Sequence, residues 1–187
     1  MSFQKLANLA DRCNQLVGSG IKWLTLIMML TTVAVVLLRY VFQAGNLIFL
    51  RDSVIYMHSA CFLLGAGWTL GRGGHVRVDV FYRRWSVRTK AWIDTLGTLV
   101  FLFPLALFIL LSSFEFVGQS WSIRETSMEP GGIPTVYLLK TLIPAMAILL
   151  IIQGFAELIR NAAILVSDSA EPEQSTERQA EQPERAS

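Results

Sequence analysis

Charged residues, cysteines and histidines are all scarce in this chain. Asp, Glu, Lys and Arg make up 16% of its 187 residues and hydrophobic residues make up 53%, whereas an ordinary soluble domain is roughly 25% charged. Two cysteines, Cys13 and Cys61, are too few for a disulfide framework or a four-thiolate metal site. The net charge of +2 is too small to favour a nucleic-acid partner. The composition therefore indicates an integral membrane protein.

Four apolar tracts are long enough to cross a bilayer. They are residues 21–42, 53–70, 92–117 and 134–159, and about 20 helical residues cover the hydrocarbon core. We therefore predict an all-α integral membrane protein with four transmembrane helices in a membrane domain of residues 21–165. Pro104 and Pro144 fall inside the last two tracts. Each proline removes a backbone hydrogen bond and is expected to kink its helix.

Lysine and arginine are unevenly distributed between the connecting segments. The segment between the second and third tracts carries six of them, namely Arg72, Arg77, Arg83, Arg84, Arg88 and Lys90. The opposite ends of the tracts carry only Arg39, Arg51 and Arg124. Cytoplasmic loops are enriched in these residues, so the middle segment and both termini are predicted to be cytoplasmic. The other two connections then face the periplasm of a two-membrane bacterium.

The two ends of the chain differ from the membrane domain. Residues 1–20 are predicted to form an interfacial amphipathic helix that turns into the first span at Gly18-Ser19-Gly20. Its apolar stripe consists of Phe3, Leu6, Ala10, Cys13 and Val17. The alternative is that this segment simply extends the first span. Residues 166–187 consist mainly of Glu, Gln, Ser, Ala and Pro without aromatic residues, so a disordered acidic tail is predicted.

Aromatic residues flank the basic middle segment. Tyr82, Trp85 and Trp92 are predicted to anchor the chain at the membrane interface, where such side chains are enriched. The neighbouring arginines suit anionic lipid headgroups. Ser86 is a suitable N-cap for the helix that enters the third span.

Groups that could carry chemistry are rare inside the membrane tracts. Their central parts hold no Asp, Glu, Lys, Arg or His except His58, although such residues mark the ion and proton pathways of carriers. We interpret His58 as a hydrogen-bonding residue between helices. His58 and His75 lie at opposite ends of the second tract and cannot clasp one haem or zinc ion. No catalytic residue, cofactor or metal site is therefore predicted.

Small residues gather in the second tract, where they permit close approach of another helix. They are Ser59, Ala60, Gly65, Ala66 and Gly67. The neighbouring helix belongs either to this chain or to another membrane protein, and the residues alone leave both interpretations open. The features described so far leave two functions open for the chain as a whole. It could be a membrane-anchor subunit of a redox complex or a stand-alone small exporter.

Two stretches resemble a known family. The first is Arg39-Tyr40-Val41-Phe42 followed by Gly71-Arg72-Gly73-Gly74-His75-Val76-Arg77-Val78-Asp79-Val80, and the second is Ser120-Trp121, Glu125, Ser127, Gly131-Gly132-Ile133-Pro134, Lys140, Ile143-Pro144 and Gln153-Gly154. Over residues 15–165 the chain resembles the small membrane subunit of tripartite ATP-independent periplasmic (TRAP) transporters, the DctQ-like permeases. Its version is similar to the mannitol/chloroaromatic or 2-oxo-acid branch. Phe49-Leu50-Arg51-Asp52 departs from the Trp and Glu of many members.

The resemblance implies a role in transport without catalysis or a cofactor. In that family a periplasmic solute-binding protein captures a solute, usually an organic acid. A large permease subunit carries the substrate and sodium sites and moves like an elevator. The small subunit enlarges the static scaffold and helps to receive the binding protein. The implied partners are therefore the large TRAP permease subunit, the solute-binding protein and the lipids of the bacterial inner membrane.

Within that family, two groups of residues are predicted to make contacts. His75, Arg77 and Asp79 cluster where the chain leaves the second span, and they are expected to fix the cytoplasmic surface by mutual pairing or by lipid or partner contacts. On the outer face, five charged residues are expected to lie near the docked binding protein. They are Arg51, Asp52, Arg124, Glu125 and Glu129.

Overall fold

The computed structural model describes residues 2–72 and 85–180, and in this part of the chain it contains helices and no β-strand. The helices are α1 (Ser2–Tyr40), α2 (Ile48–Gly71), α4 (Val87–Gly97), the π-helix η1 (Thr98–Leu102), α5 (Phe103–Ser122) and α6 (Val136–Ala180). Four stretches are long and apolar enough to cross a membrane, namely Ala7–Tyr40, Ile48–Gly71, Val87–Ser122 and Val136–Val166. The prediction of an all-α, four-span membrane protein is confirmed.

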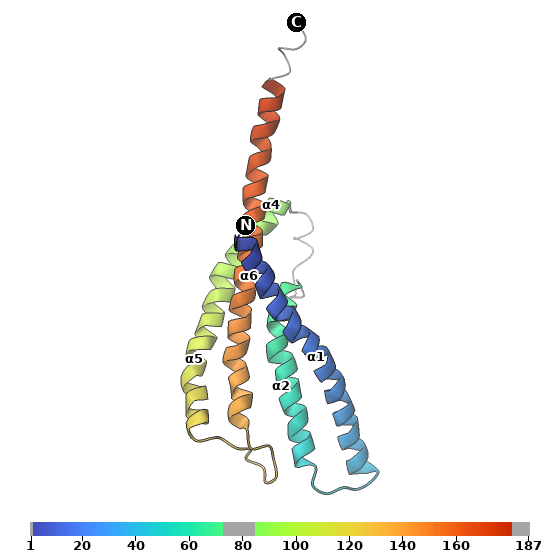
Figure 1. Ribbon diagram of the computed structural model, residues 1–187. Coiled ribbons are helices and arrows are strands. Elements are labelled where there is room, and N and C mark those ends of the chain that lie inside the picture. Colours follow the sequence, from blue (N-terminus) through green and yellow to red (C-terminus); the bar gives the residue numbers. More distant parts are fainter. Residues whose placement is uncertain (1, 73–84, 181–187) are drawn as a thin grey trace.

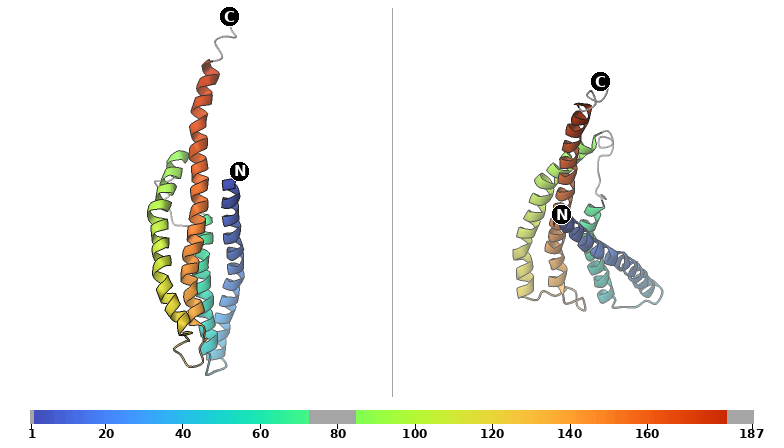
Figure 2. Two further views of the ribbon diagram at one scale, coloured as in Figure 1. Left: turned by 60° about the vertical axis from the view of Figure 1, so that its left-hand side comes forward. Right: turned by 45° about the horizontal axis from the view of Figure 1, so that its top comes forward.

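Helix α6 is the centre of the arrangement. It contacts α1, α2, α4, η1 and α5, with α1 and α2 on one side of it and the α4–η1–α5 stretch on the other (Figure 1). The starts of α1 and α4 lie towards one end of the molecule, which we call the terminal end. The connections 41–47 and 123–135 lie together at the opposite end, which we call the loop end (Figure 2).

Most apolar side chains of the four spans face outwards. The buried apolar residues of the described chain are Ala7, Ala91, Ala106, Val117, Ala147, Leu149 and Ala156. By contrast, Phe62, Phe101 and Phe108 are 71%, 74% and 68% exposed. Such a surface is stable only where lipid or another apolar protein surface covers it. The helices therefore meet through small residues and leave their large apolar side chains available to the membrane.

Helix α1 runs without a break through Gly18-Ser19-Gly20, so the predicted turn there is wrong. The reason is the packing of Gly18, which lies against the indole of Trp68 on α2. A Cβ at this position would collide with the Trp68 ring. Gly18 therefore allows two helices to approach closely rather than allowing the chain to turn. The helix is continuous with the first span, and the interfacial position of residues 1–20 stays a prediction.

Helix α6 continues to Ala180, in place of the disordered tail expected from residue 166. Glu, Gln and Ala, which are frequent here, are good helix formers. A helix that is already nucleated in the membrane also extends without the unfavourable first turn. The composition of the tail therefore excludes burial but does not exclude a helix.

The third span begins at α4 and is interrupted by the π-helical segment η1. At its start, the Ser86 hydroxyl accepts a hydrogen bond from the Thr89 N–H at 3.2 Å, which confirms Ser86 as the N-cap of α4. Pro104 lies in the first turn of α5, directly after η1. Proline has no backbone N–H to donate, and a π-helical turn is a local change of the hydrogen-bond pattern that fits such a missing bond. Pro144 lies inside the unbroken helix α6, and a kink there stays a prediction.

Candidate functional site

Asp52 ties the start of α2 to the connection between α5 and α6 at the loop end. Its side chain is buried, with 8% of the residue exposed. Its Oδ2 accepts a hydrogen bond from the Ile133 N–H at 3.1 Å. Gly132 is next to this contact, and a Cβ there would lie 2.5 Å from Asp52 Oδ2 and also collide with the Ser127 hydroxyl. Asp52 therefore has an internal hydrogen-bond partner, and its predicted contact with another protein stays a prediction.

Glu125 closes the same connection onto α6. Its Oε2 lies 2.5 Å from Lys140 Nζ and accepts a hydrogen bond from the Ser120 hydroxyl at 2.6 Å. The hydrogen bond from Lys140 lowers the pKa of the Glu125 carboxyl below its ordinary value, and the Ser120 hydroxyl lowers this pKa further. The Lys140 ammonium also lies 4.1 Å from the ring centroid of Phe116. Glu125 is therefore held inside the chain's own contacts.

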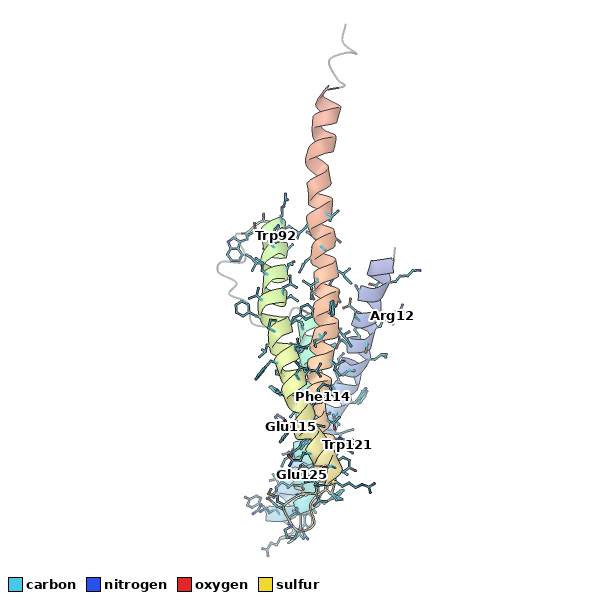
Figure 3. All side chains as sticks on the ribbon, turned by 90° about the vertical axis from the view of Figure 1, so that its left-hand side faces the viewer. Arg12, Trp92, Phe114, Glu115, Trp121 and Glu125 are labelled. Carbon is cyan, nitrogen blue, oxygen red and sulfur yellow. The ribbon has the colours of Figure 1, made fainter. Side chains whose placement is uncertain are left out.

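An aromatic contact joins α5 to α6 beside Glu125. The Trp121 Nε1–H donates to the Thr141 hydroxyl at 2.9 Å. The Trp121 and Tyr137 rings meet edge to face, with 4.7 Å between their centroids. Trp121 and Glu125 lie together towards the loop end, whereas Trp92 lies towards the terminal end (Figure 3). The α5–α6 connection is thus fixed by both polar and aromatic contacts.

Arg51 and Glu129 form an ion pair that stays open to solvent. Their side chains are 48% and 50% exposed. The pair borders a cleft of about 270 Å³, which is lined by Val35, Arg39, Ala44, Gly45, Leu47, Ile48, Arg51 and Glu129. Arg124 is exposed outside this cleft, at a positive φ of 47°. The structure therefore brings Arg51 and Glu129 together, gives Asp52 and Glu125 internal partners and leaves Arg124 apart.

Other predicted site residues have different outcomes. His75, Arg77, Asp79 and Tyr82 lie outside the described residues. Trp85 and Trp92 are 39% and 51% exposed near the start of α4, and their role as interface anchors stays a prediction. His58 is exposed on α2, and its side chain makes no hydrogen bond within the part of the chain that the structure describes. Its role as a hydrogen-bonding residue between helices therefore stays a prediction that needs a partner from another chain.

A polar cluster at the terminal end was missed by the sequence analysis. The α1–α6 polar cluster consists of Asp11, Asn14, Gln153, Glu157 and Arg160. The Asn14 amide Nδ2 donates to Gln153 Oε1 at 2.7 Å, and the Gln153 Nε2 donates to Asp11 Oδ1 at 2.9 Å. Asn14 is 2% exposed and Gln153 is fully buried. These two amides therefore join α1 to α6 through hydrogen bonds that exclude solvent.

Arg160 completes the α1–α6 polar cluster. Its Nη1 donates to Asp11 Oδ2 at 2.6 Å, and its Nη2 donates to Glu157 Oε1 at 2.7 Å. One guanidinium thus links a carboxylate of α1 to a carboxylate of α6. The sequence signal was Gln153, a polar residue inside an otherwise apolar tract, because such side chains hydrogen-bond to other helices. Its partners lie 139 and 142 residues away, which the sequence could not reveal.

Glycines of α2 let this helix lie against the polar cluster. A Cβ at Gly67 would lie 2.5 Å from Asn14 Oδ1 and 3.0 Å from Leu149 Cβ, and a Cβ at Gly71 would lie 2.6 Å from Gln153 Nε2. At least part of the small-residue face of α2 therefore packs within this chain.

Together these contacts define a class of protein, a four-span membrane protein whose helices are clamped at both ends. Among the described residues, no group of three His, Cys, Asp or Glu side chains is placed to hold a metal ion.

Residues 28–163, more than two thirds of the chain, match the family described as tripartite ATP-independent periplasmic transporters, DctQ component. The chain belongs to this family. It is therefore a multi-pass component of a transporter and not an enzyme. No curated protein and no solved structure matches the chain.

Proposed function

We propose that the chain is the small scaffold subunit of a sodium-coupled TRAP transporter that takes up an organic acid. Family membership is the observation that carries this proposal. The DctQ component of such systems works with a large permease and a solute-binding protein. Here the chain enlarges the static part of the large elevator-type permease, and the large subunit carries the substrate and sodium ions. The mannitol/chloroaromatic or 2-oxo-acid branch remains part of the proposal.

The distribution of side chains supports a scaffold role. A static scaffold needs apolar faces for lipid and for a neighbouring subunit, and α1, η1 and α5 present such faces through residues such as Trp23, Phe101 and Phe108. It also needs helices that keep their relative positions. The α1–α6 polar cluster and the Glu125–Lys140 pair provide fixed contacts at the two ends.

We further propose that the terminal end faces the cytoplasm of a bacterium and the loop end faces the periplasm. The basic residues near the terminal end, among them Lys5, Arg12 and Arg160, support this orientation. Met128 in the 123–135 connection is 98% exposed. A membrane-impermeant maleimide should therefore label Met128→Cys, but not Cys13, in cells whose outer membrane is removed. Labelling of Cys13 but not of Met128→Cys would contradict this orientation and indicate the opposite one.

Purification of the tagged chain from native membranes in mild detergent tests the subunit role. We expect a large, many-span permease in near-equal amount by mass spectrometry. Cells that lack the chain should lose uptake of the solute that the copurified permease carries, and expression of the chain should restore it. Recovery of the folded chain without a permease would contradict the subunit role. A haem absorption spectrum from the purified chain would instead favour a redox complex.

A further inference from the structure

The cleft at the loop end is bordered by two arginines from different helices. Arg39 comes from the last turn of α1 and Arg51 from the start of α2, on either side of the 41–47 connection, which lies at the lower end of Figure 1. Arg39 is exposed and has no side-chain partner among the described residues. Arg51 pairs with Glu129. One carboxylate thus faces two guanidinium groups in this cleft.

The other carboxylates of the loop end do not balance this excess of positive charge. Asp52 is buried and accepts a hydrogen bond from the Ile133 N–H, and Glu125 accepts hydrogen bonds from Lys140 and Ser120. Neither residue lines the cleft. A guanidinium recognises a carboxylate through paired, charge-assisted hydrogen bonds. The cleft is therefore suited to receive a further carboxylate.

The size of the cleft favours a single side chain over a whole solute molecule. Its volume of about 270 Å³ lies below the range of roughly 300–1,000 Å³ that is typical of small-molecule pockets. The Arg51–Glu129 pair is half exposed, and exposed ion pairs contribute little to stability. An incoming carboxylate therefore exchanges with Glu129 at small cost.

We propose that this cleft receives a carboxylate side chain from an acidic patch on the solute-binding protein. Arg39 and Arg51 are the receiving cations, and Glu129 is an internal occupant that the incoming carboxylate displaces. This assignment rests on the proposed function, since it assumes that the loop end faces the binding protein. It changes the expected role of Glu129 from a partner contact to a competitor of the partner.

The test measures the affinity of the solute-binding protein for the assembled transporter in lipid nanodiscs. Loss of one exposed ion pair corresponds to about a fivefold change in affinity. We therefore expect Arg39→Gln to weaken binding about fivefold, and Arg39→Lys to restore part of the loss. Glu129→Gln should tighten binding, because it removes the competing carboxylate. Arg124→Gln is the matched control, since it removes one exposed positive charge of the same face outside the cleft.

Two results would overturn the assignment. Weaker binding by Glu129→Gln would make Glu129 itself a contact of the partner. An equal effect of Arg39→Gln and Arg124→Gln would indicate general attraction between the two surfaces rather than a cleft. Copurification of the large permease with each variant confirms that the complex is still assembled.

Two further comparisons separate other causes. An effect of Arg39→Gln that appears in phosphatidylglycerol nanodiscs and disappears in phosphatidylcholine nanodiscs would assign Arg39 to a lipid phosphate and overturn the cleft. A wild-type transporter that assembles with its permease but never binds the binding protein would contradict the proposed function itself. Normal wild-type binding that Arg39→Gln leaves unchanged would remove the cleft assignment alone.

Discussion

The two ends of the molecule use polar residues in opposite ways. At the terminal end, Asn14 and Gln153 are 2% and 0% exposed, and they bond to each other across α1 and α6. At the loop end, the side chains of Arg51 and Glu129 are about half exposed. A buried amide that loses its partner keeps the full penalty of lost hydration, whereas an exposed ion pair exchanges easily with water and salt. The polar contacts at the terminal end therefore fix α1 on α6, whereas the ion pair in the cleft at the loop end can exchange its partners.

This difference also separates two kinds of helix contact. The α1–α6 contact depends on hydrogen bonds inside an apolar surrounding, where they are strong and directional. The α5–α6 connection depends on Glu125 with Lys140 and on Trp121 with Tyr137, nearer to solvent. Substitutions at the terminal end should therefore change the stability of the fold more than substitutions at the loop end.

The largest effect is expected for Gln153→Leu. This change removes the Gln153 acceptor of the Asn14 amide, which keeps only a 3.4 Å hydrogen bond to the Ala10 carbonyl, and it removes the hydrogen bond to Asp11. We expect the free energy of unfolding in detergent to fall by about 3 kcal/mol, because two hydrogen bonds of a buried side chain are lost. Gln119→Leu is the matched control, because Gln119 is exposed on α5 and its side chain makes no hydrogen bond within the described residues. Equal stability of the two variants would show that the buried amides do not hold α1 on α6.

The next effect is expected for Gly67→Ala. The new methyl group would lie 2.5 Å from Asn14 Oδ1 and 3.2 Å from the backbone oxygen of Leu149. Since a backbone cannot yield like a flexible side chain, α2 and α6 must separate, and we expect a loss of about 2 kcal/mol. Gly118→Ala on α5 meets nothing within 4 Å, so it should be neutral or should stabilise the helix by up to about 1 kcal/mol. A neutral Gly67→Ala would mean that α2 does not depend on this close approach.

Local sequence patterns predicted the spans but not the contacts between them. The length and apolar character of each tract fix a transmembrane helix, and Ser86 was recognised as an N-cap because capping involves neighbouring residues. Gly18 was misread as a turn because its real reason, the Trp68 ring, lies 50 residues away on α2. The α1–α6 polar cluster was missed for the same reason, because its members are far apart in the sequence. Asp11 and Arg160, for example, are 149 residues apart.

The candidate site was predicted in composition but not in pairing. The five outer residues do lie at the loop end, since each is close in sequence to one of its two connections. However, charge alone did not show that Asp52 would be buried on the Ile133 N–H, or that Arg51 and Glu129, 78 residues apart, would meet. Which charges remain free for a partner is decided by these tertiary contacts.

The smallest effect is expected from protonation of Glu125 at the loop end. Lys140 and Ser120 lower its pKa in the folded chain, so the carboxylate stabilises the fold fully above the ordinary glutamate pKa of about 4.3. This stabilisation is lost as the pH falls through the lowered pKa. Glu125→Gln should therefore be less stable than wild type near neutral pH, and the difference in midpoint of thermal unfolding should shrink below about pH 4. Glu115→Gln, an exposed carboxyl on α5, is the control. A difference that stays constant with pH would mean that the Lys140 contact does not act through the charge of Glu125.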